Sequence, residues 1–458
     1  MKKNFKLLAF TAVVLFAVSA CKKEKMDPIQ DSLELKRANN GMIKSYDNTM
    51  VLKWNEELSK AIDNKMPPPP ESRIYAMVSI AVHDALNNVV PKYETYALDN
   101  SWNDGKEVSK KTIYLVADAA VAQAAHDVLV ALFPPSIPST DALLADCLSG
   151  IEDSELKDAG IQIGKDAAKA MLEKRQGDAP STFVVYPQGV APGEYRSYLP
   201  WSGPGPIWQP NSVYAPNWGE TKPFGVMSGN EFRAAPPYAL NSPEYAADYN
   251  EVKTIGSESS VVRTPEQTEM GIFFTDNMPS MLNKATRYVA ASTELNGWET
   301  ARLIALVQMS EADALICTFE SSFLYNFWRP ITAIHEGNSD GNDNTEGEPG
   351  WLALTAGRAI PPLPPYPSSY ASAGKAGAEI LKMFFGTDNI PFVVESYTMP
   401  GVERSYSSFS QVATDMQLSR IYVGHNFRND NVAGDKIGKQ VAEYVFKNNL
   451  RAYEIDVK

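Results

Sequence analysis

The chain contains little cysteine, no cluster of basic residues and few alternating strand patterns. Three cysteines occur among 458 residues. Cys147 and Cys317 stand in apolar helical surroundings, so we expect two buried free thiols rather than a disulfide. The formal net charge of −13 argues against nucleic acid as a partner, because phosphate backbones are bound by clustered lysine and arginine. It does not exclude a small anion, since a few local arginines are enough for that.

Because strand alternation is scarce and apolar residues recur at helical spacing, we predict an all-α protein of two packed helical bundles. Helices are expected over residues 51–64, 71–88, 110–132, 265–274, 281–295, 298–323, 369–385, 408–422 and 431–449, with one or two more between 143 and 176. The four prolines at 67–70 predict a polyproline break before the second helix. No fixed-period repeat is found, which argues against a solenoid.

The N-terminus has the pattern of a secretion signal. Lys2, Lys3 and Lys6 precede an apolar run at residues 7–18, and small residues then lead to Cys21. A cysteine at this place resembles the lipobox of bacterial lipoproteins, which implies cleavage before Cys21 and acylation of its thiol. We therefore expect a signal peptide (1–20), a lipid-linked tether (21–45) and a protein anchored to a bacterial membrane in an extracytoplasmic space, periplasm or outer membrane.

The alternative for the N-terminus is an ordinary secretion signal with an incidental cysteine. No other stretch is expected to be long and apolar enough to cross a membrane.

The body of the chain divides into an N-terminal helical domain (46–180), an irregular wrapping segment (181–264) and a C-terminal helical domain (265–458). The wrapping segment crowds proline, glycine and tryptophan together, as in residues 201–208. It is too aromatic for disorder and too rich in proline for a helix or a central strand. A long irregular segment of this kind often lines the mouth of a cleft.

Two arginines and one serine suggest an oxyanion pocket. Arg329 follows a long helix beside aromatic residues, and Arg420 stands at the end of another helix. Ser372 lies in the first turn of a helix, where unpaired backbone N–H groups and the helix dipole favour an anion. Two guanidinium groups and a hydroxyl suit a tetrahedral oxyanion such as phosphate or vanadate. The alternative is that each arginine pairs with a nearby carboxylate, Glu311, Asp313, Glu320 or Asp415.

These stretches resemble the signature motifs of the vanadium-dependent haloperoxidase and type 2 phosphatidic acid phosphatase superfamily. Residues 325–334 (YNFWRPITAI) are similar to the first motif, residues 361–375 to the second, and residues 404–409 with 419–431 to the third and its approach. Weaker likeness extends to residues 80–85 and 124–134. The resemblance implies helical bundles with the oxyanion pocket in the C-terminal one, and vanadate as the cofactor of the haloperoxidases.

The resemblance assigns oxyanion-binding roles to Arg329, Ser372 and Arg420. Three other family positions are substituted here. The family lysine falls on Ser322, the acid–base histidine on Gly374, and the histidine that binds vanadium or attacks phosphorus on Asn426. An amide nitrogen has no lone pair free for either task. We therefore expect weakened oxyanion binding and a lost nucleophile.

Neighbouring residues are candidates to substitute. His425 precedes Asn426 and Lys375 follows Gly374, but one step along a helix turns a side chain by about 100°. His335 follows the first motif and is a candidate for the pocket mouth. His83 and His126 lie in alanine-rich helices and are interpreted as core or interface histidines.

No metal site is predicted. Residues 340–348 alternate acidic and amide side chains, as in a calcium loop, but Thr345 stands where an EF-hand requires glycine. We interpret this stretch as a solvated loop.

Three functional hypotheses follow. The first is a lipid-anchored, catalytically degenerate member of the superfamily that binds a small oxyanion or another small molecule. The second is an active haloperoxidase or phosphatase that uses His425. The third is an outer-membrane lipoprotein that binds a glycan or peptide through the aromatic segment at residues 201–218.

Overall fold

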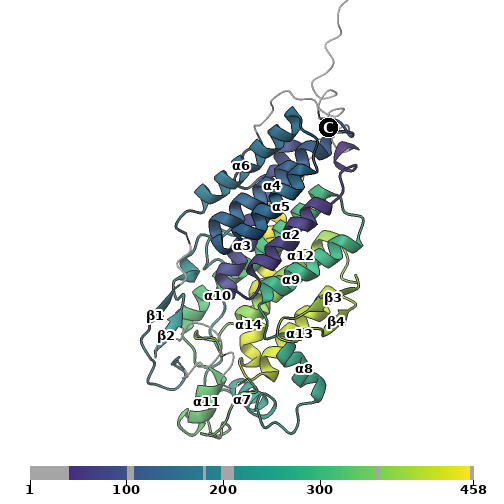
Figure 1. Cartoon of the computed structure of the whole chain (residues 1–458). Helices are drawn as coiled ribbons and strands as arrows, with labels where there is room; N and C mark the ends of the chain where they lie inside the picture. Colours follow the sequence, from purple (N-terminus) through teal and green to yellow (C-terminus); the bar gives the residue numbers. More distant parts are fainter. Residues whose placement is uncertain (1–40, 101–107, 179–181, 198–210, 356–359, 454–458) are drawn as a thin grey trace, which may run out of the picture. The chain divides into compact units, whose positions relative to one another are not determined.

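The computed structural model describes residues 41–100, 108–178, 182–197, 211–355 and 360–453. Helices dominate these residues, which confirms the all-α prediction (Figure 1). The helices are α2 (Thr49–Ile62), α3 (Pro68–Val89), α4 (Ile113–Leu132), α5 (Ile137–Ser149), α6 (Glu155–Lys174), α7 (Pro243–Ile255), α8 (Pro265–Phe273), α9 (Met278–Ser292), α10 (Gly297–Tyr325), α11 (Pro330–Glu336), α12 (Ser369–Phe385), α13 (Phe409–Tyr422) and α14 (Arg428–Asn448).

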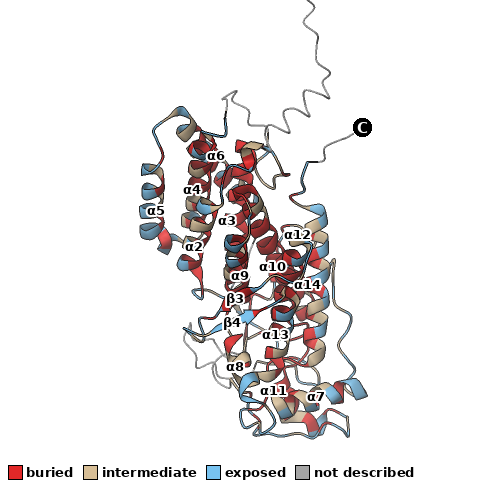
Figure 2. Cartoon of the chain, turned by 90° about the vertical axis from the view of Figure 1, so that its right-hand side faces the viewer, coloured by how far each residue is buried: buried red, intermediate tan, exposed pale blue. Residues whose placement is uncertain are grey.

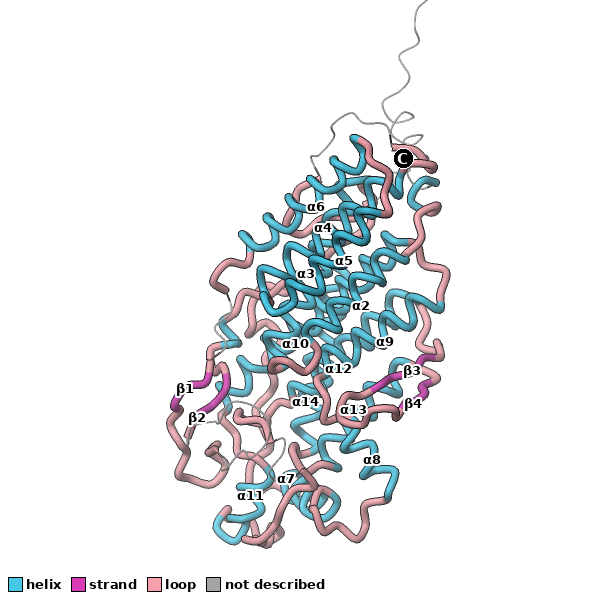
Figure 3. Tube along the Cα trace, in the orientation of Figure 1, coloured by secondary structure: helices cyan, strands magenta, loops and turns pink. Residues whose placement is uncertain are grey.

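Two short antiparallel strand pairs accompany the helices (Figure 3). Strand β1 (Phe183–Val185) pairs with β2 (Ser212–Tyr214), and β3 (Phe392–Glu395) pairs with β4 (Glu403–Tyr406). Both pairs are too short to form a core, so the hydrophobic interior belongs to the helices.

The proline run opens α3 instead of forming a separate polyproline break. Pro67 is the N-cap, and Pro68 begins the helix. The first turn of a helix has no intrahelical acceptors for its N–H groups, so residues without an N–H fit there at little cost. The expectation of a polyproline break before this helix was therefore wrong.

Helix α4 is long and apolar enough to cross a membrane, which corrects the expectation that no stretch after the N-terminus has this property. In the structure 67% of its most apolar stretch is buried, and α4 packs against α3 and α6. The contact with α6 is close: a Cβ on Gly160 would lie 2.3 Å from the Val116 carbonyl oxygen. A core helix of a bundle has this composition as readily as a membrane span does.

Helix α10 connects the two bundles. It runs 29 residues and begins with a capping box between Asn296 and Glu299. It ends at Asn326, whose φ of 48° is left-handed. Most of α10 is buried (Figure 2), because it packs against α3 of the N-terminal bundle and against α12 and α14 of the C-terminal bundle.

Helices α12 and α14 pack closely through glycine. A Cβ on Gly434 would lie 2.2 Å from the Ser368 carbonyl oxygen, and one on Gly438 would lie 2.1 Å from that of Ser372. Only residues without a side chain allow this approach. The spacing of four residues places both glycines on one face of α14.

The segment between the bundles is ordered where the structure describes it. Its Tyr195 N–H donates to the Asn326 carbonyl (2.8 Å), and the Trp328 N–H donates to the Gly193 carbonyl (2.9 Å). The segment thus lies along the residues that lead into Arg329. It also contains α7, which the sequence analysis did not anticipate and which begins at a serine cap followed by proline.

The tryptophans at residues 201–208 lie outside the described residues. Trp218, the last tryptophan of the same stretch, is 1% exposed and packs in a cluster with Ile316 and Phe319 of α10. It therefore supports the core, and a ligand on the surface could not reach it. Cys147 and Cys317 are both buried and free, as expected.

Candidate functional site

The motif stretches meet at the ends of helices. Arg329 occupies the N-cap position of α11, and Arg420 lies in the last turn of α13. Both reach His425 in the turn between α13 and α14: Arg329 Nη1 donates to the His425 carbonyl (3.1 Å), and Arg420 Nη2 lies 2.8 Å from His425 Nδ1. The structure therefore brings these three predicted residues together.

Arg329 and Arg420, here called the arginine pair, carry buried positive charge. They are 4% and 6% exposed. The Nε atom of each is buried and has no hydrogen-bond partner among the described residues. Burial lowers the pKa of both guanidinium groups to about 10, so both remain charged at neutral pH. A buried N–H donor without an acceptor is costly, and here two such donors belong to two groups of like charge.

Three of the four carboxylates named as alternative partners are engaged elsewhere, and none of the four forms an ion pair with either arginine among the described residues. Asp313 accepts the backbone N–H groups of residues 224–226, Glu320 pairs with Arg233, and Asp415 accepts from the Tyr406 hydroxyl. Glu311 is fully buried, and neither of its oxygens has a hydrogen-bond partner in the described part of the chain. The hypothesis of simple structural ion pairs was therefore wrong for both arginines.

His425 is held as a neutral imidazole of one tautomer. A guanidinium only donates hydrogen bonds, so His425 Nδ1 must accept from Arg420. The proton then sits on Nε2 and is donated to Thr355 Oγ1 at 2.6 Å. Burial lowers the pKa of His425 well below its usual value, and the charges of Arg420 and Arg329 lower it further. Thr355 carries no sequence signal that would have predicted this contact.

His425 lies one residue before the family histidine position, yet its side chain still faces the arginines. Gly424 has a φ of 76°, which ends the helical path after Val423. The helical rotation of about 100° per residue therefore does not apply here.

The first turn of α12 completes the arrangement. Ser368 caps this helix by accepting from the Ala371 N–H (3.3 Å), and its own N–H donates to the Asp430 carbonyl (2.8 Å). The Tyr370 ring lies 4.7 Å from Arg420 Cζ. The N–H groups of Ser369 and Tyr370 have no intrahelical acceptor at this position. The residue whose ring contacts Arg420 thus also carries one of the N–H groups that lack an intrahelical acceptor.

Ser372 and Gly374 face other helices. Ser372 Oγ donates to the Ala314 carbonyl of α10 at 3.4 Å. A Cβ on Gly374 would lie 3.0 Å from Met416 Sδ of α13. The contacts in the described residues thus place Ser372 at a helix junction and Tyr370 at the arginine pair. The sequence did contain a signal for Tyr370. With Ser368 as the N-cap, Tyr370 is the second residue of the helix and lies in the first turn, where the N–H groups lack intrahelical acceptors.

The two other substituted positions hold the proline-rich loop before α12. Ser322 Oγ donates to the Pro367 carbonyl (3.4 Å), and Asn426 Nδ2 donates to the Pro365 carbonyl (3.0 Å). Asn426 Nδ2 also lies 3.3 Å from Asp430 Oδ2. Burial raises the pKa of Asp430 to about 8, while the charge of Arg329 opposes this rise.

The remaining candidates lie elsewhere. Lys375 pairs with Glu379 at 2.9 Å, and His335 Nε2 lies 2.7 Å from the Trp351 carbonyl oxygen. His83 is fully buried against the Glu94 carbonyl, and His126 lies between Asp127 of its own helix and Asp141 of α5. None of these contacts reaches the arginine pair.

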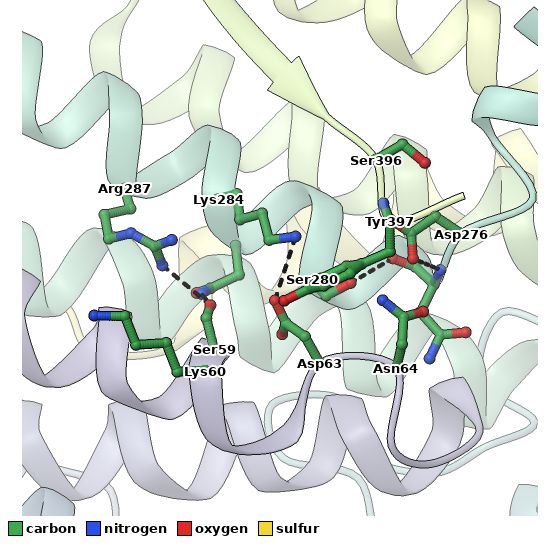
Figure 4. Close-up of polar contacts among 12 residues, drawn as sticks. Ser59, Lys60, Asp63, Asn64, Asp276, Ser280, Lys284, Arg287, Ser396 and Tyr397 are labelled. Carbon is green, nitrogen blue, oxygen red and sulfur yellow. Dashed lines mark hydrogen bonds and ion pairs between the residues drawn. The ribbon is translucent and has the colours of Figure 1, made fainter. Parts of the chain in front are cut away.

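A second polar cluster joins α2 to α9 and has its own internal partners (Figure 4). Lys284 lies 3.4 Å from Asp63, Arg287 donates to Ser59 (3.1 Å), and Asp276 accepts the Tyr397 N–H (2.7 Å). We interpret it as a bridge between helices. Asp340, in the loop with a faint calcium pattern, accepts from the Thr345 hydroxyl with both oxygens.

Comparisons with known proteins agree with this architecture. A family model described as the VCPO second helical-bundle domain matches residues 302–454. The vanadium chloroperoxidase of Curvularia inaequalis is 24% identical over an alignment of 406 residues, which covers 74% of the chain and 66% of that enzyme, just under two thirds.

Two solved structures share the fold. A bacterial vanadium-dependent iodoperoxidase superposes with a TM-score of 0.72 at 19% identity, covering 90% of this chain and 98% of that one. A holo-type bacterial vanadium-dependent chloroperoxidase gives 0.65 at 16% identity, covering 84% and 93%. The fold of this chain is therefore the helical-bundle fold of these enzymes, and the arginine pair lies in it at the start of α11 and the end of α13. Residues 302–454 match the VCPO second helical-bundle family, and the chain as a whole shares the fold of the vanadium haloperoxidases.

Proposed function

We propose that this protein binds a phosphate- or vanadate-type oxyanion through the arginine pair and does not carry out the reactions of its superfamily. One observation carries the proposal: two buried guanidinium groups share a site, and the Nε donor of each has no partner in the described residues. The first turn of α12, whose N–H groups lack intrahelical acceptors, is linked to Arg420 through the Tyr370 ring and offers further donors. A charge-assisted site of this kind matches the tetrahedral oxyanions.

The residues fit an anion held by charge better than vanadium held by a bond to nitrogen. A vanadium ligand or a phosphorus nucleophile needs an imidazole nitrogen with a free lone pair. His425 Nδ1 uses its lone pair on Arg420, and Nε2 carries the proton donated to Thr355. Asn426 is an amide whose nitrogen donates to Pro365. The residues present therefore do not fit vanadate held through a bond to nitrogen.

The alternative is an active haloperoxidase or phosphatase that uses His425. Among the histidines, His425 is the best candidate because it contacts Arg420. The test is to assay the full chain with vanadate, peroxide and iodide or bromide, and with a phosphate ester. Background rates in both assays are expected. Turnover that is present in the wild type and lost in His425→Ala would contradict the proposed degeneracy and support the alternative.

We further propose that the protein acts as a lipoprotein, anchored through Cys21 to a bacterial membrane and facing an extracytoplasmic space. Its support is the charged, apolar and small-residue order before Cys21. Cys21→Ala should release the protein from the membrane fraction, and mass spectrometry should find the lipid on the wild type alone. Unchanged fractionation of Cys21→Ala would contradict the anchor. Glycan or peptide binding by residues 201–218 remains a prediction.

A further inference from the structure

Arg420 is held in place by an aromatic ring rather than by a carboxylate. The Tyr370 ring lies 4.7 Å from the guanidinium carbon, and the side chain is 6% exposed. The guanidinium group also donates a hydrogen bond from Nη2 to His425 Nδ1. A ring face attracts a guanidinium without neutralising it, whereas a carboxylate would cancel the charge.

The contact between Tyr370 and Arg420 also links Arg420 to the start of α12. Tyr370 is the second residue of α12, so its own N–H and that of Ser369 are among the free donors of the first turn. The ring therefore ties Arg420 to the end of the helix that carries the other donors. The phenol hydroxyl is not needed for this tie: its recorded acceptor is the sulfur of Met281 at 3.5 Å, a weak one.

We propose that Tyr370 is a positioning residue of the oxyanion site, whose ring aligns Arg420 with the first turn of α12 so that one anion meets both. The inference rests on the proposed anion site. It assigns to Tyr370 a role that depends on the ring face and not on the hydroxyl. It also explains how a buried arginine keeps its charge available without a fixed acidic partner.

The test is calorimetric titration of inorganic phosphate into the full chain and into Tyr370→Phe and Tyr370→Leu. The ring is kept in the first variant and lost in the second. We expect Tyr370→Phe to bind as the wild type does and Tyr370→Leu to bind about 3- to 30-fold more weakly, the range set by the usual strength of a cation–π contact. Tyr93→Leu is the matched control, because it removes a similar contact, 5.0 Å from Arg302, away from the arginine pair.

Each outcome has a distinct meaning. Equal affinity of wild type and Tyr370→Leu would overturn the inference and leave the anion site standing. Equal weakening in Tyr370→Phe and Tyr370→Leu would also overturn it, because the hydroxyl would then be the active part. Absence of phosphate binding by the wild type would contradict the proposed function itself. If Tyr370→Leu fails to fold, Tyr370→Met supplies the same comparison with an unbranched side chain.

Discussion

At the scale of single residues, the site is defined by which atoms have partners and which do not. Both ring nitrogens and the carbonyl of His425 form hydrogen bonds with neighbouring residues. Each of the two arginines next to it has one buried donor, Nε, without a partner among the described residues. A residue that is fully bonded in this way orients its neighbours and is poorly placed to attack a substrate. Two of the three motif positions that depart from the superfamily pattern, Ser322 and Asn426, donate hydrogen bonds to loop carbonyls.

The bonding of His425 predicts its behaviour in solution. Burial and the charges of Arg420 and Arg329 hold the pKa of His425 well below the ordinary value of about 6.5. The ring should therefore stay neutral, with the proton on Nε2, at the pH where an ordinary histidine becomes charged. Nitrogen NMR checks this, with His425→Gln for assignment. His126 is an internal contrast: burial lowers its pKa, but the ion pairs with Asp127 and Asp141 outweigh burial and raise it. A His425 signal that titrates near pH 6.5 would contradict the tautomer described.

At the scale of elements, the site depends on how α14 holds α12. The glycines of α14 lie against the carbonyls of Ser368 and Ser372, and the first turn of α12 carries Tyr370. A shift of α12 along α14 would therefore move the free N–H groups relative to Arg420. The fold positions the site through this contact.

A methyl group at the contact should be poorly tolerated. In Gly438→Ala the new Cβ would lie 2.1 Å from a backbone oxygen that cannot rotate away. We expect a loss of about 1–3 kcal/mol in the free energy of unfolding, the usual cost of overpacking. Urea unfolding measures it, and Gly350→Ala, where the Cβ would meet nothing within 4 Å, is the control. Equal stability of the two variants would argue against this packing.

Helix α10 carries a buried acid that should make stability depend on pH. Burial raises the pKa of Glu311 well above its usual value, and the charge of Glu71 raises it further. A raised folded pKa means that stability is present below the unfolded value and is lost as pH rises toward the folded one. The free energy of unfolding of Glu311→Gln should therefore rise relative to that of the wild type as pH increases, by at most about 1.4 kcal/mol per pH unit.

Urea unfolding at a series of pH values from 5 to 9 tests this dependence. Glu443→Gln, on a half-exposed carboxylate of α14, controls for the loss of a charge at the surface. A stability difference between wild type and Glu311→Gln that stays constant with pH would show that the acid is not held in its neutral form.

At the scale of the whole molecule, the sequence predicted most of the fold and part of the site. Helix α12 falls on the predicted residues 369–385, because a serine cap and a regular apolar stripe mark it. Helix α7 escaped prediction, since its short amphipathic pattern lies in a proline-rich stretch. The arginines were predicted from their places at helix ends and from motif likeness. Their unpartnered donors, the contact with Tyr370 and the role of Thr355 depend on distant segments meeting, which no local pattern encodes.

The most direct test of the account is a calorimetric titration of inorganic phosphate into the wild type and into the double variant Arg329→Gln/Arg420→Gln, in a phosphate-free buffer. The wild type should bind, and its melting temperature should rise with phosphate concentration, because a ligand that binds only the folded state stabilises it. The double variant should show neither effect. Arg428→Gln is the control. It removes an arginine of the same motif that is paired with Glu251, and it should bind phosphate as the wild type does. Binding that is absent in the wild type, or preserved in the double variant, would contradict the assignment of the arginine pair as an oxyanion site.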